Sequence, residues 1–210
     1  MITSKSIYHA NAAILFKGEG FHTPDNSEFA ALYKGTQATG ARFLDDPFLN
    51  AKILILPELK TRIVLERSRL RVEDESQDDP KKSNAIANLF HVYEQLFKNE
   101  KIEAYGFNFD IFYRFNTLIP IKEIYNSMFK GQPGEGRDLL DVGIQYTFDN
   151  QKEKYKEVWF TKVVSPLELA VHINRHFDRR KLPIHTDMKD QFVETYEEAD
   201  KVVKSFKFNI

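Results

Sequence analysis

In the stretch EAYGFNFDIFYRFN, apolar side chains, most of them aromatic, recur at every second position, and this alternation strongly constrains the fold. Successive side chains of an extended strand point to opposite faces of a sheet. One face then carries Tyr105, Phe107, Phe109, Ile111, Tyr113 and Phe115. The other carries Gly106, Asn108, Asp110, Phe112 and Arg114. We expect the first row to be core beneath a helix and the second to face outward. A base-stacking surface would keep its rings beside Lys and Arg on one face, so the pattern favours core.

The composition sets the class of protein. The 210 residues suffice for one large domain or two small ones, and 42% apolar with 29% charged residues is ordinary for a globular protein. Lys and Arg together number 30 and Asp and Glu 31. A polyanion would therefore not be attracted by net charge, and a nucleic-acid surface would have to be local.

The absence of cysteine excludes disulfides, thiolate metal sites and a cysteine nucleophile. No apolar run approaches the roughly 20 residues that a membrane-spanning helix needs. The apolar stretch at residues 10–16 is short and interrupted by Asn11, which argues against a signal sequence. We therefore expect a cytoplasmic protein that does not contact a membrane.

Periodicity and capping signals predict six elements in the first half of the chain: a strand, a short helix, three strands and a long helix. They are a strand at 11–18; a helix capped by Asp25, Asn26 or Ser27 and ending at Gly35; a strand from Ala51 closed by Pro57; two strands within 61–75 that turn near Ser68; and a long helix opened by Pro80.

The second half repeats this order. It begins with the aromatic strand, followed by a helix from Pro120 to Gly131. Three strands follow within LLDVGIQYTFD, EVWFTKVV and LELAVHINRHF. A long amphipathic helix, with Thr186 or Asp187 as its N-cap, closes the chain.

The repeated order predicts an α+β fold: a βαβββα unit used twice, at residues 1–101 and 102–210, with pseudo-twofold symmetry. Mostly antiparallel sheet, in one or two sheets, would be covered on one side by the two long helices. No clear linker separates the halves, so we expect one compact body. The alternative is an unrepeated α+β domain. In outline the arrangement resembles the saddle of TATA-binding proteins, a likeness of architecture without a shared motif.

Two polar strands, RSRLRVEDE and ELAVHINRHFDRRK, hold the candidate site residues. The candidate ligand-binding residues are Arg69, Arg71, Glu73, His172, Asn174, Arg175 and His176. Arginine presents a forked donor set that suits phosphate groups. His172 and His176 would stand about 13 Å apart, too far for one metal ion to be held by that strand alone. A metal site would need ligands from a neighbouring strand, such as Glu73 or Asp110, and we expect neither a metal nor a cofactor. Nucleotide loops, nucleophile elbows and metalloprotease motifs are missing from the sequence.

The end of the chain, KSFKFNI, supplies the candidate interface residues Phe206, Phe208 and Ile210. Apolar residues at a chain end usually dock against the protein body or another subunit. A protein partner or a homodimer is one expectation, and docking onto the chain's own sheet is the other.

These observations favour a non-enzymatic binding or interaction protein of unknown ligand that uses the uncovered mixed-charge sheet face or the Phe-rich end. The alternative is a protein that binds nucleic acid or a phosphate ligand, or an enzyme acting on a phosphate-containing substrate through His172 and His176 with the nearby arginines. The plainest alternative is a solvated face whose arginines and glutamates pair across strands.

Overall fold

The computed structural model describes residues 1–33, 40–121 and 142–205, which form an α+β fold with one antiparallel sheet. The strands are β1 (Ile2–Phe16), β2 (Arg42–Asp46), β3 (Ala51–Leu56), β4 (Thr61–Glu66), β5 (Arg69–Asp74), β6 (Ile102–Phe115), β7 (Gly143–Asn150), β8 (Tyr155–Ser165) and β9 (Glu168–Phe177). The helices are α1 (Asn26–Ala31), α2 (Ala85–Val92) and α4 (His185–Ser205), with 3-10 turns η1 (Pro57–Leu59) and η2 (Pro80–Lys82) and a π-helical turn η3 (Tyr93–Phe97).

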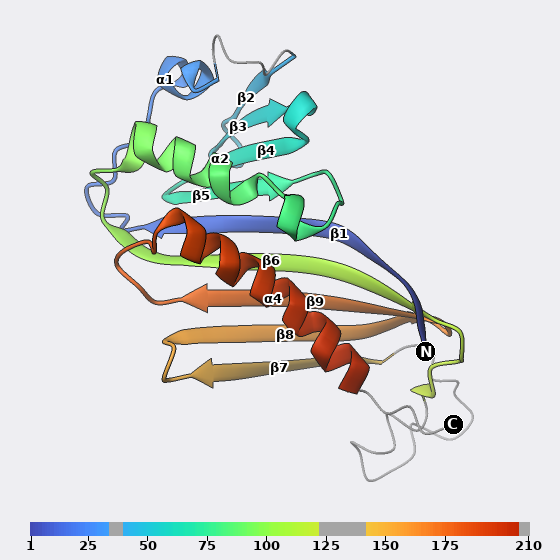
Figure 1. The fold of residues 1–210 in the computed structure, drawn as a ribbon. Coiled ribbons are helices and arrows are strands. Elements are labelled where there is room, and N and C mark those ends of the chain that lie inside the picture. The colour runs from blue at the N-terminus through green and yellow to red at the C-terminus, as the bar shows by residue number, and fades with distance from the viewer. Residues whose placement is uncertain (34–39, 122–141, 206–210) are drawn as a thin grey trace.

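All nine strands belong to one sheet, in the order β2-β3-β4-β5-β1-β6-β9-β8-β7. The long strands β1 and β6 pair in its centre and join the two halves of the chain (Figure 1). Each neighbouring pair of strands is antiparallel. The strands of both halves thus build one continuous sheet.

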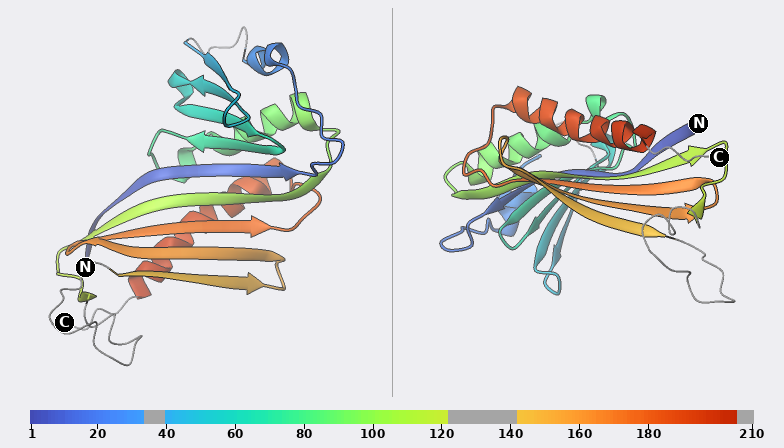
Figure 2. Two further views of the ribbon diagram at one scale, coloured as in Figure 1. Left: turned by 180° about the vertical axis from the view of Figure 1, so that it is seen from behind. Right: turned by 90° about the horizontal axis from the view of Figure 1, so that it is seen from below.

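Helices α2 and α4 lie on the same side of the sheet, and no helix of the described chain lies on the other side (Figure 2). We call that second side the open face. Its central strands β5, β1, β6 and β9 present the following side chains. They are Arg69, Arg71 and Glu73; His9, Asn11 and Ala13; Gly106, Asn108 and Asp110; and His172, Asn174 and His176.

The core lies between the sheet and the two helices, and β6 supplies its centre. Phe107 and Phe109 are both 0% exposed. Both rings contact Phe192 of α4, with centroids 5.5 and 4.7 Å from its ring. The prediction that the rings of this strand point inward beneath a helix is therefore confirmed, because α4 is amphipathic and presents its apolar stripe to that row.

Several boundaries differ from the prediction. The first strand begins at Ile2 rather than residue 11, because its polar first part pairs with the far half of β6. Strand β2, an addition to the predicted elements, pairs with β3. The helix expected from Pro80 is divided into η2, α2 and η3. Helix α4 begins at His185, so Thr186 and Asp187 lie in its first turn and not at its N-cap.

Other local predictions are confirmed. Asp25 caps α1 in a reciprocal capping box with Glu28. Pro57 follows β3, and the β4–β5 hairpin turns at Arg67 and Ser68. The helix predicted at 120–131 lies outside the described residues apart from its first two positions, and so do the predicted interface residues Phe206, Phe208 and Ile210. Within the described residues, no helix is both long and apolar enough to cross a membrane.

Candidate binding site on the open sheet face

Most of the predicted ligand-binding residues share the open face. Arg69, Arg71 and Glu73 lie on β5, and His172, Asn174 and His176 lie on β9. Strands β1 and β6 separate these two groups. The structure therefore brings the two polar rows to one surface but not into direct contact, and β1 and β6 supply the side chains between them.

Arg175 is not on the open face. Its odd position in β9 turns the side chain toward the helices, where the residue is 2% exposed. Its Nε lies 2.5 Å from Glu157 Oε1, and its guanidinium lies 4.7 Å from the centre of the Tyr155 ring. Arg175 is thus held in the core by an ion pair and a cation–π contact, away from the other candidates.

Glu73 contacts two arginines on the β4–β5 side of the open face. Its carboxylate lies 2.8 Å from Arg71 Nε and 3.4 Å from Arg62 Nη1. Arg62 also reaches Glu75, at 2.6 Å. Burial would raise the pKa of Glu73, but His9, whose Nε2 lies 3.8 Å from Glu73 Oε1, and the charges of Arg71 and Arg62 outweigh burial and lower this pKa. Much of the positive charge here is neutralised within the protein.

A second network crosses the centre of the face. Asp110 Oδ1 lies 2.7 Å from His172 Nδ1, and Asp110 Oδ2 lies 3.3 Å from His9 Nδ1. The close approach of Asp110, and then of Glu73, raises the pKa of His9 to about 9. Burial would raise the pKa of Asp110, but its hydrogen bonds to His172 and His9 outweigh burial and lower this pKa. The raised pKa favours the protonated form of His9, which lies between the two carboxylates.

This raised pKa predicts a pH-dependent stability. His9 binds its proton more tightly in the folded protein than in the unfolded chain. The protonated side chain therefore adds its full contribution to the free energy of unfolding below the unfolded pKa of about 6.5, and this contribution declines as the pH rises through about 9. We expect the difference in unfolding free energy between the wild type and His9→Gln to be largest near pH 6 and to shrink toward pH 9.5. Urea unfolding at a series of pH values measures it.

The matched control is His22→Gln, which changes an exposed histidine outside the network. A difference between the wild type and His9→Gln that stays constant from pH 6 to 9.5 would contradict the assignment of a stabilising charge to His9. The same pH range keeps Asp110 ionised, because the pKa of this carboxyl is lowered, so its titration does not enter the comparison.

Three asparagine side chains form a ladder across the central strands. Asn174 Nδ2 donates to Asn108 Oδ1 at 2.7 Å, and Asn108 Nδ2 donates to Asn11 Oδ1 at 2.9 Å. These residues are direct neighbours in the registers of β9, β6 and β1. Each amide has two N–H donors, so the ladder keeps further donors for a ligand.

A hollow of about 300 Å³ lies beside the ladder. It is lined by Ala13, Leu15, Arg69, Ala104, Tyr105, Gly106, Asn108, Asn174 and His176. Small residues on β1 and β6 make room for it. At Gly106 a larger residue would not fit, because an added Cβ would lie 2.6 Å from the backbone oxygen of Arg175. The close approach of β6 to β9 at Gly106 thus forms part of the hollow.

Arg69 stands at the edge of this hollow. Its side chain is half-buried and makes no hydrogen bond or direct ion pair with the residues that the structure describes, although Glu66 and Glu73 are near enough to interact with its charge. Burial, and then the nearby charge of Arg71, lower its pKa. Even so, an arginine remains charged at neutral pH. Arg69 is thus a cation that no carboxylate of the described residues contacts directly, and it lines the same hollow as the amides of Asn108 and Asn174.

Sequence patterns alone did not assign several of these residues to the site. His9 was expected outside the first strand, yet β1 extends to Ile2 and places His9 between Glu73 and Asp110. Asn11, Ala13 and Gly106 gave no functional signal. The alternation of His9, Asn11 and Ala13 in phase with the open face was the pattern that could have identified the β1 residues.

No group of three or more histidine, aspartate or glutamate residues in the described ranges is arranged to hold a metal ion. The chain matches no protein-family model and no curated protein sequence. A function for this chain is therefore inferred from the residues of the site itself.

Proposed function

We propose that this chain is a binding protein whose ligand lies on the open sheet face and places an anionic group in the hollow beside Arg69. The observation that carries the proposal is the half-buried guanidinium of Arg69 at the rim of the hollow, without a partner among the described residues. Burying a charge without a partner is unfavourable, and an anionic ligand group would supply that partner.

The surroundings of Arg69 favour a compact anion such as a phosphate. An arginine can donate two parallel hydrogen bonds to phosphate oxygens. Asn108 and Asn174 line the same hollow and add amide donors. The volume of about 300 Å³ lies at the small end of the range for ligand pockets. This chemistry supports recognition of a phosphate or carboxylate group on a small ligand.

The alternative of a long nucleic acid receives less support from the geometry. Polyanion binding depends on many cations that are free to neutralise phosphates. Arg71 and Arg62 already contact Glu73, and Arg175 is buried on the helix side. A protein partner or homodimer that docks on Phe206, Phe208 and Ile210 remains a separate proposal, and an elution volume above monomer size that is lost on deleting these residues would support it.

Arg69→Gln tests the proposed function. We expect inorganic phosphate to shift the NMR signals of the Gly106 backbone amide and the Asn108 and Asn174 side-chain amides. The variant should bind phosphate at least about tenfold more weakly, since a hydrogen bond to a charged group is worth about 1.5–3 kcal/mol. An NMR titration at low salt measures both affinities.

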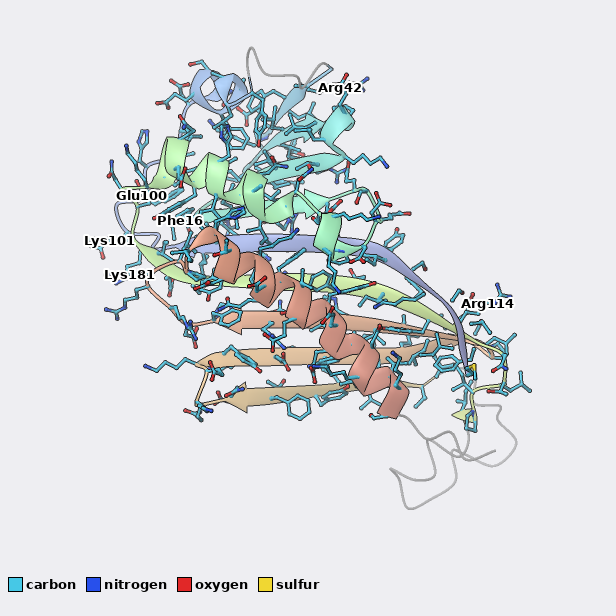
Figure 3. All side chains as sticks on the ribbon, in the orientation of Figure 1. Phe16, Arg42, Glu100, Lys101, Arg114 and Lys181 are labelled. Carbon is cyan, nitrogen blue, oxygen red and sulfur yellow. The ribbon has the colours of Figure 1, made fainter. Side chains whose placement is uncertain are left out.

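The matched control is Arg42→Gln. Arg42 is exposed on the edge strand β2, four strands away from β1 in the sheet (Figure 3). This substitution removes the same charge and should leave the affinity unchanged. Phosphate that shifts none of the three signals, or that binds Arg69→Gln as tightly as the wild type, would refute the proposal.

A second candidate is an enzyme that acts on a phosphate-containing substrate. The contact between His172 and Asp110 favours it, because a carboxylate that orients an imidazole is a common feature of general acid–base sites. His176 lines the hollow, but its Nε2 lies 2.9 Å from Asp178. Turnover of 4-nitrophenyl phosphate that is lost in His172→Ala at an unchanged melting temperature would support this candidate; no turnover in the wild type would remove it.

We also propose that the chain arose by duplication of a βαβββα unit, with α2 and α4 as the covering helices. The order of strands supports this proposal, because β1, β5, β4 and β3 on one side of the centre match β6, β9, β8 and β7 on the other. Superposition of β1, β5, β4 and α2 on β6, β9, β8 and α4 in an experimental structure tests it. Failure of the two helices to coincide would leave an unrepeated α+β domain.

A further inference from the structure

A larger pocket lies on the helix side, at the end of the sheet where β1 ends and β6 begins. We call it the end pocket. It has a volume of about 840 Å³. Its lining comes from α2 and η3, the chain around the start of β6, Lys17, and the connection from β9 into α4. Figure 3 shows Glu100, Lys101 and Lys181 gathered at this end of the molecule. The end pocket is separate from the hollow, and no residue lines both.

Cations outnumber carboxylates around the end pocket. Four cationic residues line it: Lys17, Lys101, Arg180 and Lys181. Two carboxylates line it as well, Glu94 and Glu100, which leaves a net charge of +2 with His185 neutral. No ion pair joins any of these six side chains to another part of the described chain. The pocket therefore has an excess of positive charge that is available to a ligand.

The rest of the lining is apolar and aromatic. It includes Phe90, Tyr93 and Leu182. The Phe90 ring stands edge-on to the His185 ring, with centroids 5.3 Å apart, and the Tyr93 ring lies parallel to that of Phe16 in the core, at 6.5 Å. These contacts pack both rings against neighbouring side chains. An apolar wall beside cations suits a molecule with an apolar body and an anionic group.

The local helix geometry is a second, independent observation. Tyr93 and Glu94 lie in the π-helical turn η3, which follows α2 directly. Such turns are rare, and they occur frequently at functional sites. Both residues line the end pocket, so this turn forms part of its wall.

We propose that the end pocket is a second binding site, which takes a small amphipathic organic anion. The apolar body of the ligand packs against Phe90, Tyr93 and Leu182, and its anionic group lies near Lys101 and Lys181. This site goes beyond the proposed function of the open face and does not depend on it.

A fluorescence titration with 8-anilinonaphthalene-1-sulfonate tests this site, because the probe is an aryl anion whose emission rises in apolar surroundings. We expect the double variant Lys101→Gln/Lys181→Gln to bind the probe about tenfold more weakly than the wild type. Ile184→Ser, which removes an exposed apolar side chain from the lining, should also weaken binding. The folded state of each variant is checked by its melting temperature.

Three controls decide between the proposal and simpler explanations. Lys82→Gln/Lys152→Gln removes the same charge at exposed positions outside the pocket and should change the affinity by less than about twofold. Arg69→Gln should leave probe binding unchanged. The neutral probe N-phenyl-1-naphthylamine should bind more weakly than the sulfonate.

The proposal is overturned if the two double variants behave alike, because net charge would then explain the binding. Loss of probe binding in Arg69→Gln would place the probe on the open face and also overturn it. Equal affinity for the neutral probe would remove the role of the cations. Phosphate binding in the hollow is measured separately, so failure at one site leaves the result at the other intact.

Discussion

Glu157→Gln is expected to destabilise the protein by about 3–5 kcal/mol, because removing one partner of a buried ion pair leaves the other charge uncompensated. The side chains of Arg175 and Glu157 are only 3% and 8% exposed. Glutamine keeps the shape and an acceptor for Trp159 Nε1, which donates to Glu157 Oε2 at 3.1 Å. The variant therefore removes charge with little change in packing. Urea unfolding at pH 7 measures the loss.

The matched control is Glu194→Gln. Glu194 approaches the same guanidinium, at 4.0 Å from Nη1, but its side chain is 63% exposed. Because exposed ion pairs contribute little, we expect a loss below about 1 kcal/mol. When Arg175 is first replaced by Met, Glu157→Gln should reduce the free energy of unfolding far less than it does in the wild type, since no buried cation is then left unpaired. Equal losses in the two backgrounds would show that the charge of Arg175 is not the cause.

Phe109→Ala is expected to destabilise the protein by about 3–5 kcal/mol, through lost burial and the cavity that remains. Phe109 is 0% exposed and lies in the centre of β6. Its ring contacts Phe192 and Tyr196 of α4, with centroids 4.7 and 5.7 Å away. The substitution therefore weakens the attachment of α4 to the sheet. Chemical denaturation measures the effect, and hydrogen exchange should show α4 losing protection.

Phe48→Ala makes the same chemical change at the turn between β2 and β3, where Phe48 is 98% exposed. We expect it to change the stability by less than about 0.5 kcal/mol. A small effect of Phe109→Ala, similar to that of Phe48→Ala, would contradict the placement of the β6 rings in the core.

Local patterns predicted much of the fold. The two-residue period of β6 assigns Phe107 and Phe109 to the core, and the same period in β5 assigns Arg69, Arg71 and Glu73 to one face. Asp25, Asn26 and Ser27 predict the start of α1, and the structure shows that Asp25 is the cap. Each of these features depends on neighbours within a few residues. Arg175 was a wrong candidate for the open face, because the same two-residue period places it with Ile173 and Phe177 on the helix side.

Along the chain itself, the sequence determined which side chains of each strand share a face and the order of most elements, because backbone geometry repeats over two to four residues. Only the tertiary structure decided which strands are neighbours. The pairing of β1 with both β5 and β6 places His9 between Glu73 and Asp110, and the close approach of Gly106 to β9 forms part of the hollow. Such contacts join residues far apart in sequence, and their energies depend on burial and packing that no local pattern records.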